Sequence, residues 1–294
     1  MKAEDFEAAI VIGWHKITGQ ELNLCKINGN PSEAGISKKV YRQLLSQPEY
    51  IDVGMKIATD IQKHFKLGND AKALQYGRSK SNTITEFWKG HGAKNKTPKT
   101  DIIIGDKKLS LKIGMAQLMS GGKAEATATL YAALDKSMIG KSTQVNRVTN
   151  IFEDFVTSSL CRGKIRPIIK SGRNQLVNRG ERAHKEMMRE LGVLFEENEK
   201  FKIEFVREAM SGIMKYGENS NASAEFVVSA NHNGLDTNVI SVYDDEYCKK
   251  IADNMKLQAR FKTSGRVLMG EKTGEYNYWS VVSLIVDSTM KEAA

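Results

Sequence analysis

The sequence predicts an α/β or α+β protein in which helices flank a mixed β-sheet. Several segments carry apolar residues at helical spacing, whereas a short hairpin near residue 105 and four segments after residue 220 have strand character. The chain has 294 residues, of which 40% are hydrophobic and 27% charged, enough for one large domain or two ordinary ones. This composition is typical of a soluble globular protein and not of a disordered chain.

The predicted helices follow from apolar periodicity. Residues 3–16, for example, place Phe6, Ile10 and Trp14 on one helical face. In chain order the helices are expected over 3–16, 36–46, 49–65, 123–137, 147–161, 174–191, 199–214 and 244–256, the last capped by Asp244. The helix over 123–137 is rich in small residues, which suits close packing against a sheet.

The predicted strands fall into two groups. The first is a hairpin with strands Asp101–Ile104 and Lys108–Ile113 around a Gly105-Asp106 turn. The second comprises "AEFVVSA", "TNVISVY", "LQARFKTS" and "YNYWSVVSLIV" near the C-terminus. These strands either form a subdomain or complete the sheet begun by the hairpin. Residues 66–82 and the segment "MSGGK" are expected to be loops.

Positive charge is concentrated in the first two thirds of the chain. The net charge is +9; residues 72–123 carry eleven Lys or Arg against three acids, and residues 160–190 carry nine against three. Such a surface attracts a polyanion, most commonly nucleic acid, although a solvated lysine-rich surface is the alternative. No apolar run is long enough for a membrane helix and no secretory signal is evident, so we expect a cytoplasmic protein, in the host cytoplasm if the protein is viral.

The hairpin brings an acid and a lysine together. If Ile104 pairs with Lys107 across a two-residue turn, Asp101 falls opposite Ser110; a longer turn would place Asp101 opposite Lys112. In either register Asp101 and Lys112 lie close to each other. Because residues two apart on a strand share a face, Ser110 and Lys112 point the same way.

Phosphodiester chemistry with Mg²⁺ needs more than one aspartate, because a second acid helps to hold the metal and to order the attacking water. Glu125 is the candidate. It lies thirteen residues after Lys112, in the first turn of the helix that follows Gly121-Gly122. The N-terminus of that helix can fold back over the strand ends, where its free N–H groups favour a phosphate.

Over residues 98–131 the pattern "D…SLK…E" resembles the PD-(D/E)xK nuclease superfamily, and in particular a variant found among type II restriction endonucleases. In that variant a serine replaces the strand acid and the acid has moved to the next helix. Asp101, Lys112 and Glu125 match the motif residues, and Ser110 marks the vacated position. The spacing from Lys112 to Glu125 is one residue shorter than in that variant. Thr100 departs from the pattern by replacing the usual proline.

The resemblance implies a restriction-endonuclease-like fold, with a nuclease-like core over 1–160 and a basic helical region plus a C-terminal α+β subdomain over 161–294. It also implies further site residues. Gln117 is similar to a glutamine that follows the lysine in some phage and recombination nucleases, and Glu7 lies where several families place an extra metal-binding acid. Predicted DNA contacts are Lys94, Lys96, Lys99, Ser110, Gly121, Gly122 and Lys123.

The expected function is a DNA nuclease, more specifically an endonuclease, dependent on Mg²⁺ or Mn²⁺. Asp101 and Glu125 would hold the metal, with Glu7 reaching it through water, and Lys112 would orient or help to deprotonate the attacking water. The alternatives are a non-catalytic DNA-binding or phage structural protein with a nuclease-like fold, and an RNA-binding or RNA-processing protein, which the lack of a clear aromatic stacking platform disfavours. A homodimer is compatible with cleavage of both strands.

Overall fold

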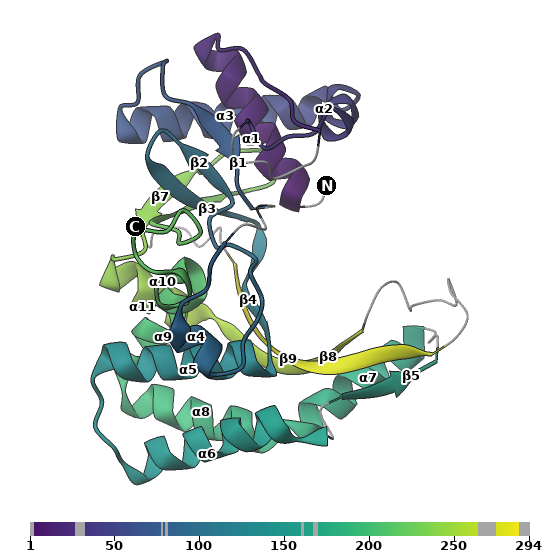
Figure 1. The fold of residues 1–294 in the computed structure, drawn as a ribbon, viewed down its shortest axis with the longest axis vertical. Coiled ribbons are helices and arrows are strands. Elements are labelled where there is room, and N and C mark those ends of the chain that lie inside the picture. The colour runs from purple at the N-terminus through teal and green to yellow at the C-terminus, as the bar shows by residue number, and fades with distance from the viewer. Residues whose placement is uncertain are drawn as a thin grey trace.

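The computed structural model describes residues 3–26, 33–77, 79, 82–159, 162–166, 170–263 and 275–287, which form two β-sheets surrounded by helices (Figure 1). The helices are α1 (Ala3–Thr18), α2 (Lys38–Leu45), α3 (Pro48–Phe65), α4 (Glu86–Gly90), α5 (Lys123–Ser137), α6 (Thr143–Thr157), α7 (Lys170–Ala183), α8 (Lys185–Glu197), α9 (Glu199–Ser211), α10 (Ile213–Tyr216) and α11 (Asp245–Asn254). The strands are β1 (Ala73–Gln75), β2 (Ile102–Ile104), β3 (Lys107–Ile113), β4 (Met115–Gly122), β5 (Arg162–Ile165), β6 (Phe226–Ala230), β7 (Asn238–Ser241), β8 (Lys256–Thr263) and β9 (Tyr276–Asp287).

The first sheet is mixed, and its strand order is β1-β2-β3-β6-β7. β3 and β6 are parallel, whereas the other neighbours are antiparallel. The predicted mixed sheet flanked by helices is therefore confirmed. The C-terminal strands β6 and β7 complete the sheet that the hairpin begins, which was one of the two expected arrangements. Each sheet combines strands from both sides of residue 160. The division into 1–160 and 161–294 stays a prediction.

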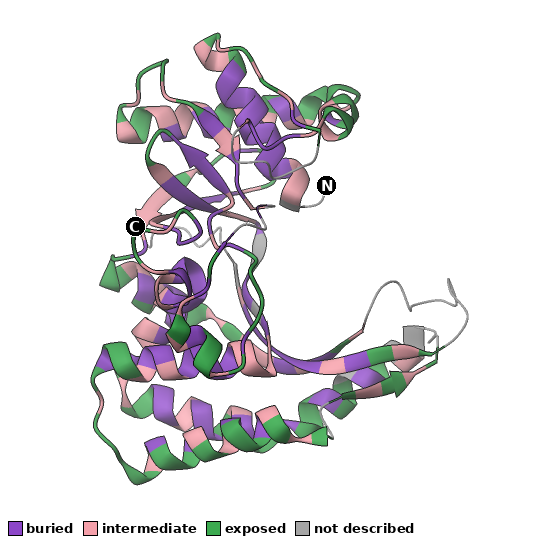
Figure 2. Cartoon of the chain, in the orientation of Figure 1, coloured by how far each residue is buried: buried purple, intermediate pink, exposed green. Residues whose placement is uncertain are grey.

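Helices cover both faces of this sheet. Apolar residues of α1 and α3, among them Ile10, Trp14 and Ile57, form one core with Ile102 and Leu109 of the sheet. The other face meets α4 and α5 through Ile103, and α5 joins α6, α8 and α9 in a further core. Figure 2 shows the buried residues where helices meet the sheet and the exposed ones on their outer sides. Within the described part of the chain, no helix is long and apolar enough to cross a membrane.

The second sheet has the order β4-β9-β5, with β8 also paired to β9. β5, β8, the first half of β9 and α7 extend together from the body, and we call these four elements the arm (Figure 1). α7 packs on one face of the arm through Leu176, which contacts Phe261 and Tyr278. β9 continues from the arm to β4, and β8 follows it for most of its length.

Several expected boundaries were wrong. The segment "MSGGK" is not a loop, because β4 runs through Gly122 and pairs with β9, 160 or so residues later in the chain. The segment 66–82 contains β1, which pairs with β2. The helix expected over 174–191 is two helices that meet at His184, and the one expected over 147–161 ends at Thr157. β5 was not expected at all. In contrast, α5 has the expected bounds.

The contact between α1 and α3 limits side-chain size. A Cβ on Gly54 would lie 2.1 Å from the carbonyl oxygen of Ala9, so the two backbones touch there. We expect Gly54→Ala to lower the free energy of unfolding by about 1–3 kcal/mol, because the helices would have to separate. Gly192 of α8 faces open space, so Gly192→Ala should raise the free energy of unfolding by roughly 0.5–1 kcal/mol. Urea denaturation followed by circular dichroism measures both values, and equal effects would contradict the close contact.

Candidate active site

The hairpin β2–β3 sets the position of three predicted site residues. Ile104 pairs with Lys107 and Ile102 with Leu109 across the two-residue turn, so Asp101 lies opposite Ser110, as one of the two predicted registers requires. Leu109 belongs to the core under α1 and α3, and Leu111 packs against it. Ser110 and Lys112 consequently point to the opposite face of the sheet.

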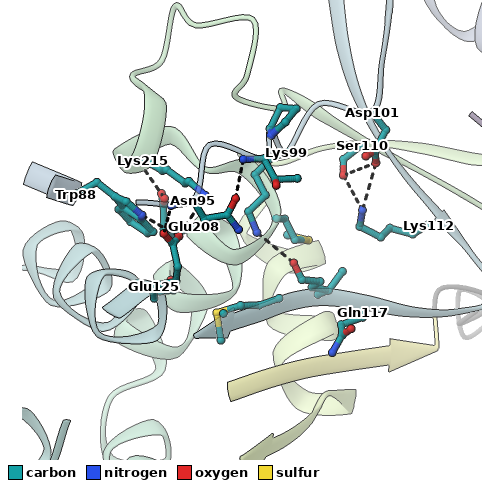
Figure 3. A pocket seen from close by; sticks show the side chains of 17 residues that line it. Trp88, Asn95, Lys99, Asp101, Ser110, Lys112, Gln117, Glu125, Glu208 and Lys215 are labelled. Carbon is teal, nitrogen blue, oxygen red and sulfur yellow. Dashed lines mark hydrogen bonds and ion pairs between the residues drawn. The ribbon is translucent and has the colours of Figure 1, made fainter. Parts of the chain in front are cut away.

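Ser110 connects the acid and the lysine. Its Oγ donates to Oδ2 of Asp101 at 3.2 Å and accepts from Nζ of Lys112 at 2.6 Å. Nζ of Lys112 lies 3.6 Å from Oδ2 of Asp101, and the same carboxylate oxygen accepts the backbone N–H of Leu111 at 2.7 Å. The serine in the vacated acid position therefore holds the ends of Asp101 and Lys112 in one hydrogen-bonded chain, as Figure 3 shows.

Glu7 approaches this chain from α1. A Cβ on Gly77 would lie 2.9 Å from Oε2 of Glu7 and 3.4 Å from Cα of Asp101. The missing side chain of Gly77 thus makes room for the carboxylate. Gln75 donates to Oε2 of Glu7 at 2.8 Å. Burial first, and then the negative charge of Asp101, raise the pKa of Glu7 to about 8.

Glu125 lies in the first turn of α5, as predicted, but its carboxylate has local partners. Oε1 accepts the backbone N–H of Asn95 at 3.0 Å, and Oε2 accepts Nε1 of Trp88 at 2.9 Å. Nζ of Lys215 lies 3.2 Å from the same Oε2. Glu125 therefore connects α5 to the loop after α4 and to α10.

A single pocket of about 260 Å³ gathers most of the predicted site residues. Asp101, Ser110, Lys112, Gln117, Glu125, Lys99 and Gly121 all line it. In Figure 3, Asp101, Ser110 and Lys112 lie at one end of this pocket, Glu125 with Trp88 lies at the other, and Lys99 lies between them. The described residues contain no group of three or more His, Cys, Asp or Glu side chains arranged to hold a metal ion.

Two charged residues that the sequence did not single out for the site also line the pocket. Glu208 of α9 has helical spacing with Glu204 and Arg207, which would suit a surface ion-pair ladder; Arg207 does pair with Glu204, but Glu208 is buried. Its carboxylate accepts the backbone N–H groups of Met214 and Lys215 at 2.9 and 3.2 Å. No local sequence pattern predicts that Glu208 and Lys215 face inward. They precede β6 in the chain, and the pairing of β6 with β3 brings this part of the chain to the pocket.

Burial also perturbs the lysines of the pocket. Burial first, and then the positive charges of Lys215 and Lys112, lower the pKa of Lys99 to about 8. Nζ of Lys99 donates to the carbonyl oxygens of Leu118 and Ala209 at 3.2 and 2.5 Å. Burial lowers the pKa of Lys215 as well. Lys99 therefore ties its loop to β4 and α9.

The remaining predicted residues lie around a second pocket or in its neighbourhood. Gly122, Lys123 and Lys94 line that pocket, and Lys96 is exposed in the same loop as Lys94. Nζ of Lys123 donates to the carbonyl oxygen of Ser158 at 2.7 Å. Arg78 and Lys80, part of the expected basic stretch, lie outside the described residues.

Comparison with known proteins gives one similar structure. No family model matches the chain, and no curated protein sequence matches it. A solved structure of the restriction endonuclease MspI in complex with its cognate DNA is similar over 82% of this chain and 87% of that chain, with 10% sequence identity and a TM-score of 0.36. At this level of similarity, function has to be inferred from the pocket of the chain itself.

Glu208 makes the stability of the fold depend on pH. Burial raises the pKa of this carboxyl to about 7, so between about pH 4.5 and pH 7 the folded chain keeps a proton that the unfolded chain releases. The stabilisation from the bound proton is lost as the pH rises through this window. Glu208→Gln does not titrate and keeps an acceptor oxygen. We expect wild type to lose roughly 1–3 kcal/mol of unfolding free energy relative to this variant between about pH 5 and pH 8.

Chemical denaturation at several pH values measures this difference. Glu196→Gln, at an exposed position of α8, is the control and should show no comparable change. Parallel pH profiles for wild type and Glu208→Gln would contradict the assignment.

Proposed function

We propose that this protein is a divalent-metal-dependent DNA nuclease that hydrolyses phosphodiester bonds, and more specifically an endonuclease. The observation that carries the proposal is the pocket itself. It places the Asp101–Ser110–Lys112 chain of the hairpin in one cavity with Gln117 of β4 and Glu125 of α5. An acid, a lysine and a second acid around one cavity are the groups that metal-assisted phosphodiester hydrolysis uses.

The donor set fits a hard divalent cation such as Mg²⁺ or Mn²⁺. Mg²⁺ is bound by one or two carboxylates and keeps several waters, so a three-acid cluster is not required. The partners of Asp101 are all on Oδ2, which leaves Oδ1 without a hydrogen bond from the described residues. Gly77 leaves room for Glu7 beside Asp101. Asp101 would hold the cation with Glu7 or Glu125, and the bound cation would polarise the phosphate and lower the pKa of a water.

Lys112 has a defined role in this proposal. A lysine ammonium has three N–H donors, and Lys112 directs two of them to Ser110 and to the carbonyl oxygen of Leu111. The third remains for a phosphate oxygen or for the attacking water. In the reaction, water loses a proton to solvent and adds to phosphorus, one P–O ester bond breaks, and the departing oxygen takes a proton from solvent. Ser110 keeps the ammonium in position next to Asp101.

The basic residues around the pocket would bind the DNA backbone. Lys94 and Lys96 are exposed in the loop that leads to the hairpin, and Arg162 and Lys164 are exposed on the arm. Contacts between such side chains and phosphates position a duplex without reading its sequence. The interactions of Lys99 and Lys123 with backbone carbonyls support the walls of the pocket.

One observation favours the second candidate, a DNA-binding protein without catalysis. Both carboxylate oxygens of Glu125 have partners, in Asn95, Trp88 and Lys215, and Figure 3 shows them at the far end of the pocket from Asp101. A glutamate that only supports α5 would have these contacts. The role of Glu125 therefore separates the two candidates.

A cleavage assay on supercoiled and linear duplex DNA, with Mg²⁺, Mn²⁺ or EDTA, tests the proposal. We expect cleavage by wild type only with metal, and a loss of at least about 100-fold in Asp101→Asn and Lys112→Met, because these groups act on the reacting phosphate. Asp106→Asn and Lys107→Met are matched controls: they alter an ion pair at the turn of the same hairpin outside the pocket, and both should keep activity.

Two further variants identify the second acid. Loss of activity in Glu125→Gln but not in Glu7→Gln would give the role to Glu125, and the reverse result would give it to Glu7. Failure of wild type to cut any of these DNAs with either metal, while salt-sensitive DNA binding persists, would support the non-catalytic candidate.

A further inference from the structure

The arm has one covered and one open face. Tyr278 and Phe261 point toward α7, their rings 4.9 Å apart, and Ser280 is hydrogen-bonded to His184 at 2.8 Å. A Cβ on Gly163 would lie 2.7 Å from the ring of Tyr278, so position 163 shares this face. Since side chains alternate along a strand, the residues between these positions belong to the open face.

The register places a row of three residues across the open face. Trp279 of β9 pairs with Arg162 of β5 on one side and with Lys262 of β8 on the other. Directly paired residues of antiparallel strands point to the same face. An indole thus lies between two cationic side chains, both of which are exposed.

Trp279 differs from the other two tryptophans. Trp14 and Trp88 are buried, at 0% and 3% exposure, and their indole N–H groups donate to Ala71 and Glu125. Trp279 is partly exposed, and its indole N–H has no hydrogen-bond partner among the described residues. Packing in a core therefore does not explain a tryptophan at position 279.

Trp279 lines the second pocket, which continues from the candidate active site. This pocket has a volume of about 390 Å³ and lies between Lys94, the start of α5 and the strands β8 and β9. Asn95 and Glu125 line both pockets. Its volume lies within the range of roughly 300–1,000 Å³ that is usual for small-molecule sites. A group bound on Trp279 would therefore be next to the cavity that contains Asp101 and Lys112.

The surroundings of Trp279 are positive. Arg162, Lys164, Arg260 and Lys262 belong to the open face, and Lys94 lies across the pocket. The nearby acids have cationic partners: Glu275 pairs with Lys164 and Glu125 with Lys215. Phosphate groups on both sides of a stacked base would complement this pattern of cations around an aromatic ring.

We propose that this pocket binds an unpaired nucleotide of a DNA strand, with its base stacked on Trp279 and the flanking phosphates on Arg162, Lys262 and Lys94. The bases of an intact duplex are stacked on each other, so only a single strand or an extruded base can offer a free face to the indole. The proposal deepens the proposed nuclease function, on which it rests for the identity of the ligand. It names single-stranded or locally unpaired DNA as the substrate class.

Binding without cleavage tests this site. The full chain with Asp101→Asn, in EDTA, is titrated with a single-stranded oligonucleotide while tryptophan fluorescence is recorded. We expect quenching that is largely lost when Trp279→Phe is added, because Trp279 is the most exposed of the three tryptophans. Added Trp279→Ala should weaken binding about tenfold, since base–aromatic stacking contributes roughly 1–3 kcal/mol. Tyr243→Ala removes another exposed aromatic and is the control.

Two more comparisons define the ligand and the cations. An oligonucleotide of abasic residues should bind wild type and Trp279→Ala equally, and a blunt duplex should be insensitive to Trp279→Ala. Lys262→Ala should reduce the salt dependence of binding, whereas Lys256→Ala, on the same strand outside the pocket, should not. Unchanged binding of single strands by Trp279→Ala, or an equal loss for the blunt duplex, would overturn the proposal.

The outcomes of this test and of the cleavage assay are independent. Quenching of Trp279 in a protein that cuts no DNA would retain the strand-binding site and reject the nuclease. Metal-dependent cleavage without quenching would retain the nuclease and reject the stacking site.

Discussion

The parallel pairing of β3 with β6 is the constraint on which the candidate site depends. β3 carries Ser110 and Lys112, and β6 begins more than 100 residues later in the chain, directly after α9 and α10. The pairing fixes those helices against the open side of the hairpin. Glu208 and Lys215 then close the pocket that Asp101 and Lys112 begin. Without this pairing, the acid and the lysine of the hairpin would face solvent.

Burial of charge in this pocket has a thermodynamic cost that local contacts offset in part. Lys215 pairs with Glu125 and lies over the rings of Trp88 and Tyr216, and Glu208 accepts two backbone N–H groups. A fold selected for stability alone could fill this space with apolar side chains, because a buried ion pair is often no more stable than its hydrophobic replacement. Charged groups retained in a cavity and perturbed by burial are typical of functional sites.

Local features of the hairpin and of α5 could be predicted from the sequence. The Gly105-Asp106 turn sets the register, which then determines the position of Asp101, and the small residues of α5 gave its bounds. Both depend on neighbours in the chain. The strand nature of Gly121 and Gly122 depends on pairing with β9, and glycine has little intrinsic preference for strands.

The residues of the two pockets that the sequence did not single out were missed for the same reason. Glu208 has the helical spacing of a surface ladder, and only its position against β4 and the hairpin turns it inward. Trp279 lies in a predicted strand, and the sequence of that strand alone does not show that one of its faces is open. Side chains alternate between the two faces of the arm, and α7 covers one of these faces, so Trp279 is exposed on the other.

β9 connects the walls of the two pockets, because it contributes Trp279 to the second pocket and pairs with β4, which lines the first. The strand has 12 residues and spans about 40 Å at the usual rise per residue. Its first half pairs with β5 in the arm, and its second half pairs with β4, which carries Gln117 and Gly121 into the candidate active site. β8 pairs with β9 across both halves. The sheet of the arm and the wall of the candidate active site are therefore parts of one continuous β-ladder with β9 at its centre. The position of β4, and with it that of Gln117 and Gly121, is thus set by the same strand that organises the arm.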